Sequence, residues 1–580
     1  MSIQSDFQIT TDQLRQGRHN AALKTAKSAM KRHKQHPVFP NLAGIALASQ
    51  NEHHKAVPFF QKALKLEPEF HDARKNLAQT LLFLKQYEKA NRMLNKLVTR
   101  TPQDAQAWHM LGLARFECAD PDGALEAVEK TLEMNPVFAQ AHNLRGLILS
   151  QLGQIVEALE CFREALRLAP NDAEILLNAS LPLSQHMMHQ EALEALERAV
   201  ALDPANVSSR YWLATQHLAL GNTEEARLGF QTTLEADPIH AAALERLVAM
   251  QSGEENAALE PQIKQALAAH SPKSSESAQL FFALGRVLNQ NKRTEDAEDA
   301  WRSGKRIMAR QIPYDPVQDT EHAKKIMARF DGTSPALEDM PSGPRPIYVL
   351  GLPRSGTTLT EAVLGANSKV KGLGERSATN KLLKPLIERD VPFDAEKMRE
   401  FVASDQALLP ELPPGTQAYV DKMPDNYRFV GFLLSAYPDA RIISITRDPR
   451  DVALSMWKSN FGDGGHSYIN DLKWMAHRFN LFAQLMRHWN SVFPGRMMTL
   501  AYEDLVSDIY SHSQSLAEYC DLEWEAPMTR PNENVEQVLT MSVTQLRQQV
   551  HTRSVGGWKQ HAEMLAPLVD GLDPELWPNL

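Results

Sequence analysis

Residues 346–364 read PIYVLGLPRSGTTLTEAVL, and they contain the clearest structural motif of the C-terminal half. The apolar run at residues 346–350 predicts a buried strand, and the spacing of apolar residues at 359–364 predicts a helix. The turn between them begins and ends with glycine, at Gly351 and Gly356. A strand, a glycine-bounded turn and a helix start together present backbone N–H groups to a phosphate or sulfate. The stretch therefore predicts an α/β domain with a parallel sheet and an anion site.

The loop departs from the nucleotide-binding motif G-x-x-x-x-G-K-[ST] at its lysine. Thr357 stands at that position, and Arg354 places a positive charge inside the loop instead. Because the lysine contacts the β- and γ-phosphates of a nucleoside triphosphate, its absence argues against a nucleotide-dependent kinase, which stays an alternative. The residues agree better with a single phosphate or sulfate, held by loop amides, the hydroxyls of Thr357 and Thr358, and a bidentate arginine.

A second strand-to-helix boundary carries another group of charged residues. Residues 440–446 read ARIISIT and predict a buried strand, and residues 452–457 predict a helix. The segment RDPRD lies between them, with Arg447 at the carboxyl end of the strand and Ser455 eight residues further on. An arginine at a strand end beside a helix start predicts a second anion site. A ligand with two separate phosphate groups would need both sites.

Together these motifs resemble the sulfotransferases that use 3′-phosphoadenosine 5′-phosphosulfate (PAPS), and most closely the tyrosylprotein branch and its bacterial relatives. The resemblance implies a P-loop-like α/β fold, PAPS as the donor of a sulfuryl group to a hydroxyl, and no metal. It implies that the residues around the 5′-phosphosulfate are Pro353, Arg354, Ser355, Gly356, Thr357 and Thr358. It also implies that the residues that bind the 3′-phosphate are Arg447 and Ser455.

Three further residues match functional positions of that family. The resemblance makes Glu375, in the sequence GLGER, the general base that takes the proton of the acceptor hydroxyl. It makes Lys422, in DKMPDN, the residue that acts with Arg354 to stabilise negative charge as the sulfuryl group leaves. Tyr502, at the end of another predicted strand, matches a tyrosine near the nucleotide. If the base lies elsewhere, the next candidates are His551 and His561.

The segment RSVGGWK at residues 553–559 matches the C-terminal motif of the family only in part. That motif, often R-K-G-x-x-G-D-W-K, closes over the 3′-phosphate and adenine, and the matching residues here are Arg553, Gly557, Trp558 and Lys559. The tyrosylprotein branch has a transition-state serine two residues before the tryptophan, where this chain has Gly556 and the nearest hydroxyl is Ser554. That branch also has arginines two and six residues after the base, whereas Arg376 comes one residue after it here. Tyrosine specificity is therefore not implied.

The N-terminal half has a proline every 34 residues, at Pro68, Pro102, Pro136, Pro170, Pro204 and Pro238. This period is that of the tetratricopeptide repeat, a helix–turn–helix unit. Small and aromatic residues recur in register with the prolines, for example Gly146 and Phe162. The pattern predicts an all-α superhelix over residues 1–310, with six good repeats, two degenerate ones and a break at residues 251–276.

Residues 311–343 are expected to form an ordered linker that contains a helix, and residues 344–580 the sulfotransferase domain. Stacked repeats form a groove suited to peptides and proteins, so we expect a protein or peptide acceptor or partner there. A rigid spacer or oligomerisation arm is the other interpretation of the repeats. A catalytically inactive repeat adaptor also stays open, although the set of matching site residues argues against it. The acceptor, which could be a tyrosine, a glycan or a small molecule, and the oligomeric state stay open.

Composition limits the remaining classes of function. A net charge of −9 over 580 residues argues against nucleic-acid binding, and no apolar run approaches the ~18 residues of a membrane span. The first residues lack the apolar segment of a signal peptide, and the three cysteines are too few and too scattered for a disulfide framework, which predicts a cytoplasmic protein. His186 and His189 have i, i+3 spacing without a carboxylate or cysteine partner in sequence, so no metal site is expected.

Overall fold

A computed structural model describes residues 2–185, 188–251, 253–330, 332, 336–337, 343–461, 464–533 and 550–580. The chain divides into two compact units, Met1–Gln216 and His217–Leu580, which we call the N-terminal and C-terminal units. This division falls within the repeats. The sequence-based boundaries at residues 310 and 343 stay predictions.

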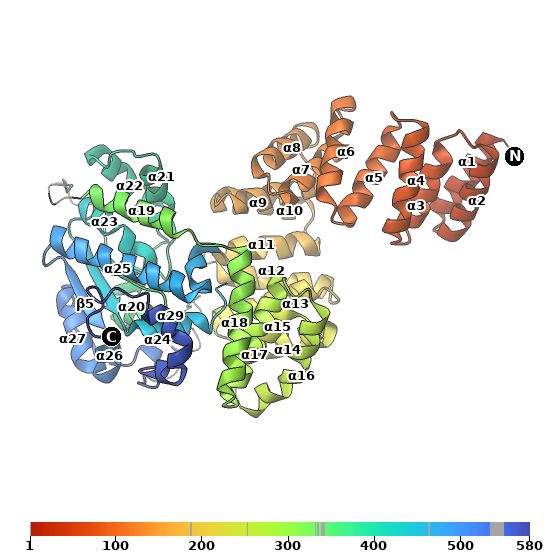
Figure 1. Ribbon diagram of the computed structural model, residues 1–580. Coiled ribbons are helices and arrows are strands. Elements are labelled where there is room, and N and C mark those ends of the chain that lie inside the picture. The colour runs from red at the N-terminus through yellow and green to blue at the C-terminus, as the bar shows by residue number, and fades with distance from the viewer. Residues whose placement is uncertain are drawn as a thin grey trace. The chain divides into compact units, whose positions relative to one another are not determined.

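The N-terminal unit consists of antiparallel helix pairs that follow one another along the chain (Figure 1). Its helices are α1 (Ile3–Arg15), α2 (His19–Arg32), α3 (Val38–Ala48), α4 (His53–Leu66), α5 (His71–Phe83), α6 (Tyr87–Arg100), α7 (Ala105–Glu117), α8 (Pro121–Met134), α9 (Ala139–Gln151), α10 (Ile155–Leu168), α11 (Ala173–Gln185) and α12 (His189–Leu202). Helix α13 (Val207–Leu220) crosses the division between the units.

The prolines of the 34-residue period mark the ends of the second helices. From α4 to α14 (Thr223–Ala236), each even-numbered helix ends two residues before one of these prolines. Proline lacks the N–H that would continue the helix, so each repeat ends there. Within a pair, the first helix comes close to the second at glycine: a Cβ on Gly146 would lie 2.8 Å from the Phe162 ring. The predicted helix–turn–helix repeats are confirmed.

The C-terminal unit continues the helix pairs with α15 (Ala241–Met250), α16 (Glu254–Ala269), α17 (Ser275–Gln290) and α18 (Thr294–Gln311). The expected break at residues 251–276 is therefore largely wrong, because α16 occupies most of it. Pro272 lies 34 residues after Pro238 and follows the end of α16, so the proline period extends through this interval. In this repeat Glu260 and Lys264 stand where the preceding repeat has Ala226 and Phe230.

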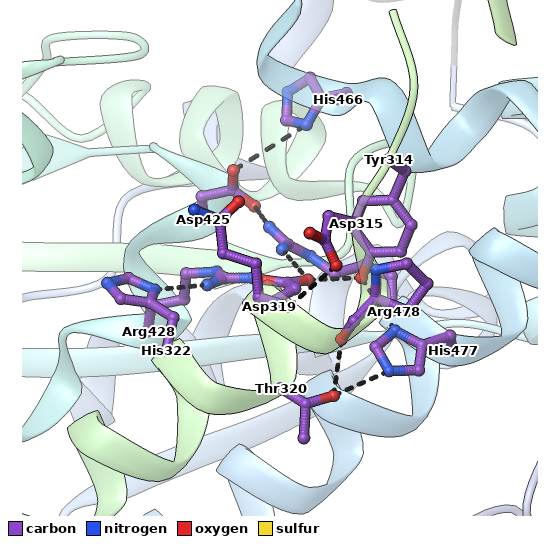
Figure 2. A network of polar contacts seen from close by, with 12 residues as sticks. Tyr314, Asp315, Asp319, Thr320, His322, Asp425, Arg428, His466, His477 and Arg478 are labelled. Carbon is purple, nitrogen blue, oxygen red and sulfur yellow. Dashed lines mark hydrogen bonds and ion pairs between the residues drawn. The ribbon is translucent and has the colours of Figure 1, made fainter.

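Helix α19 (Pro316–Ala328), in the predicted linker, is held to the rest of the unit by buried charges (Figure 2). The Asp319 carboxylate accepts hydrogen bonds from Arg478 at 2.7 Å, from Arg428 and from the Tyr314 hydroxyl. The Tyr314 hydroxyl also lies 2.9 Å from His477 Nδ1. These residues tie α19 to the short 3₁₀-helix η1 (Pro424–Arg428) and to α25 (Leu472–Val492).

The rest of the C-terminal unit is an α/β domain. Its sheet contains β1 (Arg345–Gly351), β2 (Val370–Gly372), β3 (Ala418–Asp421), β4 (Arg441–Thr446) and β5 (Met497–Ala501), in the order β2-β3-β1-β4-β5. All of the pairings are parallel. The predicted parallel sheet is therefore confirmed.

Helices cover this sheet and fill the core beside it. They are α20 (Thr357–Gly365), α21 (Ala378–Glu388), α22 (Ala395–Ala407), α23 (Val430–Ala436), α24 (Pro449–Trp457), α25, α26 (Tyr502–Ser507), α27 (Ile509–Tyr519) and α29 (Ala562–Val569). Ile347 and Val349 of β1 share one buried cluster with Val363 of α20 and Leu516 of α27, so those two helices pack on the same face of the sheet. Among the described residues, no helix is both long and apolar enough to cross a membrane.

We expect Asp319→Ala to destabilise the C-terminal unit strongly. The change would leave Arg428 and Arg478, whose side chains are each 8% exposed, without their shared carboxylate. Removing one partner of a buried ion pair typically costs about 3–5 kcal/mol, which corresponds to a melting temperature lower by roughly 10 °C. Thermal unfolding followed by tryptophan fluorescence would measure the change.

Asp390→Ala is the matched control, because the Asp390 side chain is 87% exposed in its ion pair with Arg329. Surface pairs contribute little, so this variant should melt close to the wild type. Equal melting temperatures for the two variants would contradict the structural role given to the Asp319 network.

Candidate active site

The predicted site residues follow the carboxyl ends of the five strands. Glu375 follows β2, Lys422 follows β3, Arg354 follows β1, Arg447 follows β4 and Tyr502 follows β5. In a parallel sheet these ends meet at one edge, which is where open α/β sheets bind their ligands. Along the strand order, the predicted base Glu375 lies at one end of this edge, and Tyr502, the predicted neighbour of the nucleotide, lies at the other.

The loop after β1 has the backbone that an anion site requires. Arg354 has φ +71° and Gly356 has φ +113°, and α20 begins directly after the glycine at Thr357. A Cβ on Gly356 would lie 2.4 Å from the Tyr502 ring, so only glycine fits against this ring without a shift. Thr357 and Thr358 are buried at the start of α20, as are Pro353 and Ser355 in the loop.

Arg354 connects the two predicted anion sites. Its Nε donates to Ser455 Oγ on α24 at 3.0 Å, and its carbonyl accepts from Arg447 Nη1 at 3.1 Å. Burial and the nearby charges of Arg447 and Arg286 lower the pKa of the Arg354 guanidinium to about 10. Like charges gathered in this way favour an anionic ligand.

Tyr502 and Ser554 hold Arg447 in place. The Arg447 guanidinium lies 4.4 Å from the centre of the Tyr502 ring, and its Nη2 donates to the Ser554 carbonyl at 2.6 Å. The Ser554 and Tyr502 hydroxyls are 2.9 Å apart. The serine considered as a substitute at the Gly556 position therefore contacts the nucleotide side of the site.

Glu375 and Lys422 form an ion pair. Lys422 Nζ lies 2.6 Å from Glu375 Oε1, and the lysine side chain is fully buried whereas the glutamate side chain is 45% exposed. Glu361 of α20 lies near this pair, and its carboxylate accepts from the Gly374 N–H at 2.7 Å. Burial raises the pKa of Glu361 despite the nearby charge of Lys422. The partly exposed member of the pair, Glu375, is the one that an incoming acceptor can reach.

The C-terminal segment is attached to α24 through Asp451. One carboxylate oxygen of Asp451 accepts from the Gly556 N–H at 2.7 Å, and the other accepts from the Trp558 N–H at 2.9 Å. The Arg450 guanidinium stacks on the Trp558 ring at 3.7 Å. These contacts bring Gly557 and Trp558 beside α24, whereas Arg553 and Lys559 of the same segment are exposed.

Arg376, the residue after the predicted base, has a structural role. Its guanidinium donates to Asp405 at 2.8 Å and lies 3.5 Å from an Asp421 carboxylate oxygen. All three side chains are buried, and burial raises the pKa of Asp421 to about 7. Arg376 thus belongs to a buried ionic network with residues of α22 and β3.

The donor atoms of the site suit a ligand with phosphate and sulfate groups. Ser355 Oγ and Arg447 Nε are buried and, within the part of the chain that is described, have no hydrogen-bond partner. Buried polar groups nearly always have partners, so these two donors have hydrogen-bonding capacity that an oxyanion would use. They belong to the two loops that the sequence assigned to the 5′ and 3′ groups.

Three residues that support the site were not predicted from the sequence. They are Glu361, Asp451 and Arg286. Asp451 lies in the RDPRD segment and Glu361 in the helix after the loop, so both were visible as charged residues next to a motif. Arg286 lies on the repeat helix α17, and nothing in its sequence surroundings connects it to the site.

The described residues contain no group of three or more His, Cys, Asp or Glu side chains placed to hold a metal ion. His186 lies outside the described residues. His189 is buried, and its Nδ1 lies 3.3 Å from the Gln216 amide nitrogen. His561, considered as a substitute base, is also buried and lies 2.6 Å from Glu298.

The fold and the site define an α/β domain with cationic side chains gathered at the carboxyl edge of a parallel sheet, preceded by helical repeats. The profile of the Sulfotransferase family matches residues 346–526, and tetratricopeptide-repeat profiles match residues 47–114, 109–173 and 188–250. The chain therefore carries tetratricopeptide repeats followed by a domain of the sulfotransferase family.

Individual relatives match parts of this arrangement. An uncharacterized protein of Aquifex aeolicus (strain VF5) is 30% identical over 335 residues, which cover 53% of this chain and 43% of that protein. The chain thus spans less than half of that relative. A putative protein-tyrosine sulfotransferase of Caenorhabditis briggsae is 24% identical over 231 residues, which cover 37% of this chain and 80% of the relative. Among solved structures, MamA of Desulfovibrio magneticus RS-1 is 29% identical and covers 29% of this chain and 94% of its own, with a TM-score of 0.28.

We expect Gly356→Ala to destabilise the C-terminal unit by more than a conformational penalty alone. Alanine at φ +113° is strained by roughly 1–2 kcal/mol, and its Cβ would also displace the Tyr502 ring. Gly415→Ala is the control, because Gly415 has φ +85° with open space around its Cβ position. Thermal unfolding should show the larger loss for Gly356→Ala, and equal losses would contradict the packing of Tyr502 on the loop.

Proposed function

We propose that the C-terminal domain transfers a sulfuryl group from PAPS to a hydroxyl of a protein or other macromolecule that the repeats bind. The main support is the convergence of Glu375, Lys422, Arg354, Arg447 and Tyr502 at one sheet edge. There Glu375 contacts Lys422, and Arg447 contacts both Arg354 and Tyr502. Membership of the sulfotransferase family supports the reaction class. Ser355 Oγ and Arg447 Nε, which have no hydrogen-bond partner among the described residues, support a donor with separate 5′ and 3′ anionic groups.

In this proposal PAPS supplies the sulfuryl group, and the chain positions it and moves one proton. The amides of the loop with the Thr357 and Thr358 hydroxyls bind the 5′ side, and Arg447 with Ser455 binds the 3′-phosphate. Glu375 takes the proton of the acceptor hydroxyl. Lys422 and Arg354 place positive charge beside the leaving group.

The exposures of Glu375 and Lys422 agree with this division of roles. The half-exposed carboxylate can meet an acceptor from solvent, while the buried lysine lies on the inner side of the site. Their contact of 2.6 Å keeps the base and the charge-stabilising group within one hydrogen bond of each other. Proton removal and charge stabilisation would then occur at adjacent atoms.

A macromolecular acceptor is the second part of the proposal. Repeat arrays bind extended peptides and proteins, and such binding raises the effective concentration of the acceptor at Glu375. Arg376 is engaged with Asp405 and Asp421. It is therefore not available to bind acidic residues next to a target tyrosine. We therefore leave the acceptor hydroxyl unassigned between protein and glycan. A cytoplasmic location belongs to the same proposal.

The first test is ligand selectivity. We expect adenosine 3′,5′-bisphosphate to raise the melting temperature of the full chain more than AMP or ATP does at equal concentration. A ligand at 100 times its dissociation constant adds ~2.7 kcal/mol to the stability of the state that binds it. Arg447→Ala should remove the preference, because Arg447 is the arginine at the proposed 3′-phosphate site.

Arg441→Ala is the control for that variant, since Arg441 lies at the amino end of the same strand and pairs with Asp521. It should keep the preference. A wild-type protein that ATP stabilises as well as the bisphosphate does would favour the kinase alternative, and one that neither ligand stabilises would favour the inactive adaptor.

The second test concerns the base. We expect Glu375→Gln to keep its affinity for the bisphosphate and to lose ~10²–10⁴-fold in turnover, the usual contribution of a general base. Transfer of radiolabelled sulfuryl groups from PAPS into the macromolecular fraction of a cell lysate would measure turnover and the acceptor class together.

Glu388→Gln, an exposed glutamate of α21 paired with Lys384, is the control and should retain full transfer. Transfer by Glu375→Gln at the wild-type rate would show that another residue is the base. His551 would then be the first candidate, because His561 is buried against Glu298. Label found only in small molecules would contradict the macromolecular acceptor.

A further inference from the structure

The helix pair α17–α18, the last of the repeat helices before the linker, contacts the α/β domain through a buried lysine. Lys305 of α18 is 1% exposed, and its Nζ donates to the carbonyls of Met456 and Ser459, both at 3.0 Å. Its ammonium also lies 5.1 Å from the centre of the Phe282 ring on α17. A fully buried lysine is rare and needs partners of this kind.

Met456 lies in the last turn of α24, and Ser459 lies two residues beyond its end. The last carbonyls of a helix lack partners within the helix, and a cation at this end is favourable. The Ser459 hydroxyl in turn donates to the Ser455 carbonyl at 2.9 Å, and the Ser455 hydroxyl accepts from Arg354. Lys305 is thus two contacts away from a residue proposed to bind the 3′-phosphate.

The same helix pair holds the C-terminal segment. Glu298 of α18 lies 2.6 Å from His561 Nδ1, and His561 is 2% exposed. His561 ends the short 3₁₀-helix η5 (Gly557–His561), which contains Trp558. Trp301 of α18 packs edge-on against His561, with ring centres 5.7 Å apart.

The contacts of Lys305 and Glu298 both hold segments on the predicted 3′-phosphate side of the site. One holds α24, which carries Ser455, and the other holds the segment whose Trp558 stacks on Arg450. Asp451 joins these two segments through the N–H groups of Gly556 and Trp558. The loop after β1 packs on the Tyr502 ring at Gly356, and its Arg354 donates to Ser455 of α24.

We propose that the last repeat pair, α17–α18, completes the donor site by positioning its 3′-phosphate half, with Lys305 and Glu298 as the positioning residues. The inference rests on the proposed function, because it assumes that this half of the site binds the 3′-phosphate. Neither residue contacts the donor. They fix the segments that do, so the end of the repeat array is part of the nucleotide-binding structure as well as of the repeats.

The test compares two ligands that differ only in the 3′-phosphate, adenosine 3′,5′-bisphosphate and AMP, by isothermal titration of the full-length protein. Lys305→Met keeps the length of the side chain and removes its donors. We expect it to weaken the bisphosphate about tenfold and to leave AMP unchanged. Glu298→Ala should act in the same direction, and Glu298→Gln, which keeps a hydrogen-bond acceptor for His561, should restore most of the affinity.

Glu295→Ala is the matched control, because Glu295 is exposed and lies one turn earlier on the same helix. It should bind both ligands as the wild type does. If Lys305→Met does not fold, the comparison of Glu298→Ala with Glu298→Gln carries the test. Variants that keep the bisphosphate affinity, or that weaken both ligands equally, overturn the positioning role.

The outcome also separates this inference from the function on which it rests. A wild-type protein that binds the bisphosphate no better than AMP would contradict the assignment of the 3′-phosphate site itself. A wild-type preference that the Lys305 and Glu298 variants retain in full would leave that assignment intact and reject only the role of α17–α18.

Discussion

The parallel direction of the five strands is the constraint on which the site depends. Parallel strands bring their carboxyl ends to one edge, and each strand here ends beside a residue of the site. Glu375 and Lys422 meet at 2.6 Å although 47 positions separate them in the chain, and Arg354 meets Ser455 across 101 positions. An antiparallel strand at any of these places would move its residue to the opposite edge.

Burial of charge is the second feature that runs through the C-terminal unit. Asp319 with its two arginines, Arg376 with Asp405, and Lys305 at the end of α24 each place ionic groups inside the protein. Such groups are costly to bury and depend on nearly complete hydrogen bonding, so they fix orientation more than they add stability. The segments they fix surround the sheet edge that carries the site.

The sequence predicted the elements whose signal is local. The 34-residue proline period, the apolar strands and the glycine-bounded loop depend on residues near one another in the chain, and they correspond to the helix pairs, β1, β4 and α20. Contacts between distant segments had no such signal: Lys305 with Met456, or Glu298 with His561, is visible only once the chain has folded. The helix at residues 254–269 was missed for a different reason, since its sequence keeps the proline spacing but not the small and aromatic residues.

The fixed distance between each helix end and its proline has an evolutionary consequence. Gain or loss of 34 residues at one of these prolines upstream of His217 would add or remove a whole helix pair and leave every neighbouring pair in phase. Neither Lys305 nor Glu298 lies in that part of the chain, so the proposed donor site would be unaffected. Duplication and deletion of genetic segments could therefore lengthen or shorten the array among descendants while the α/β domain is inherited unchanged.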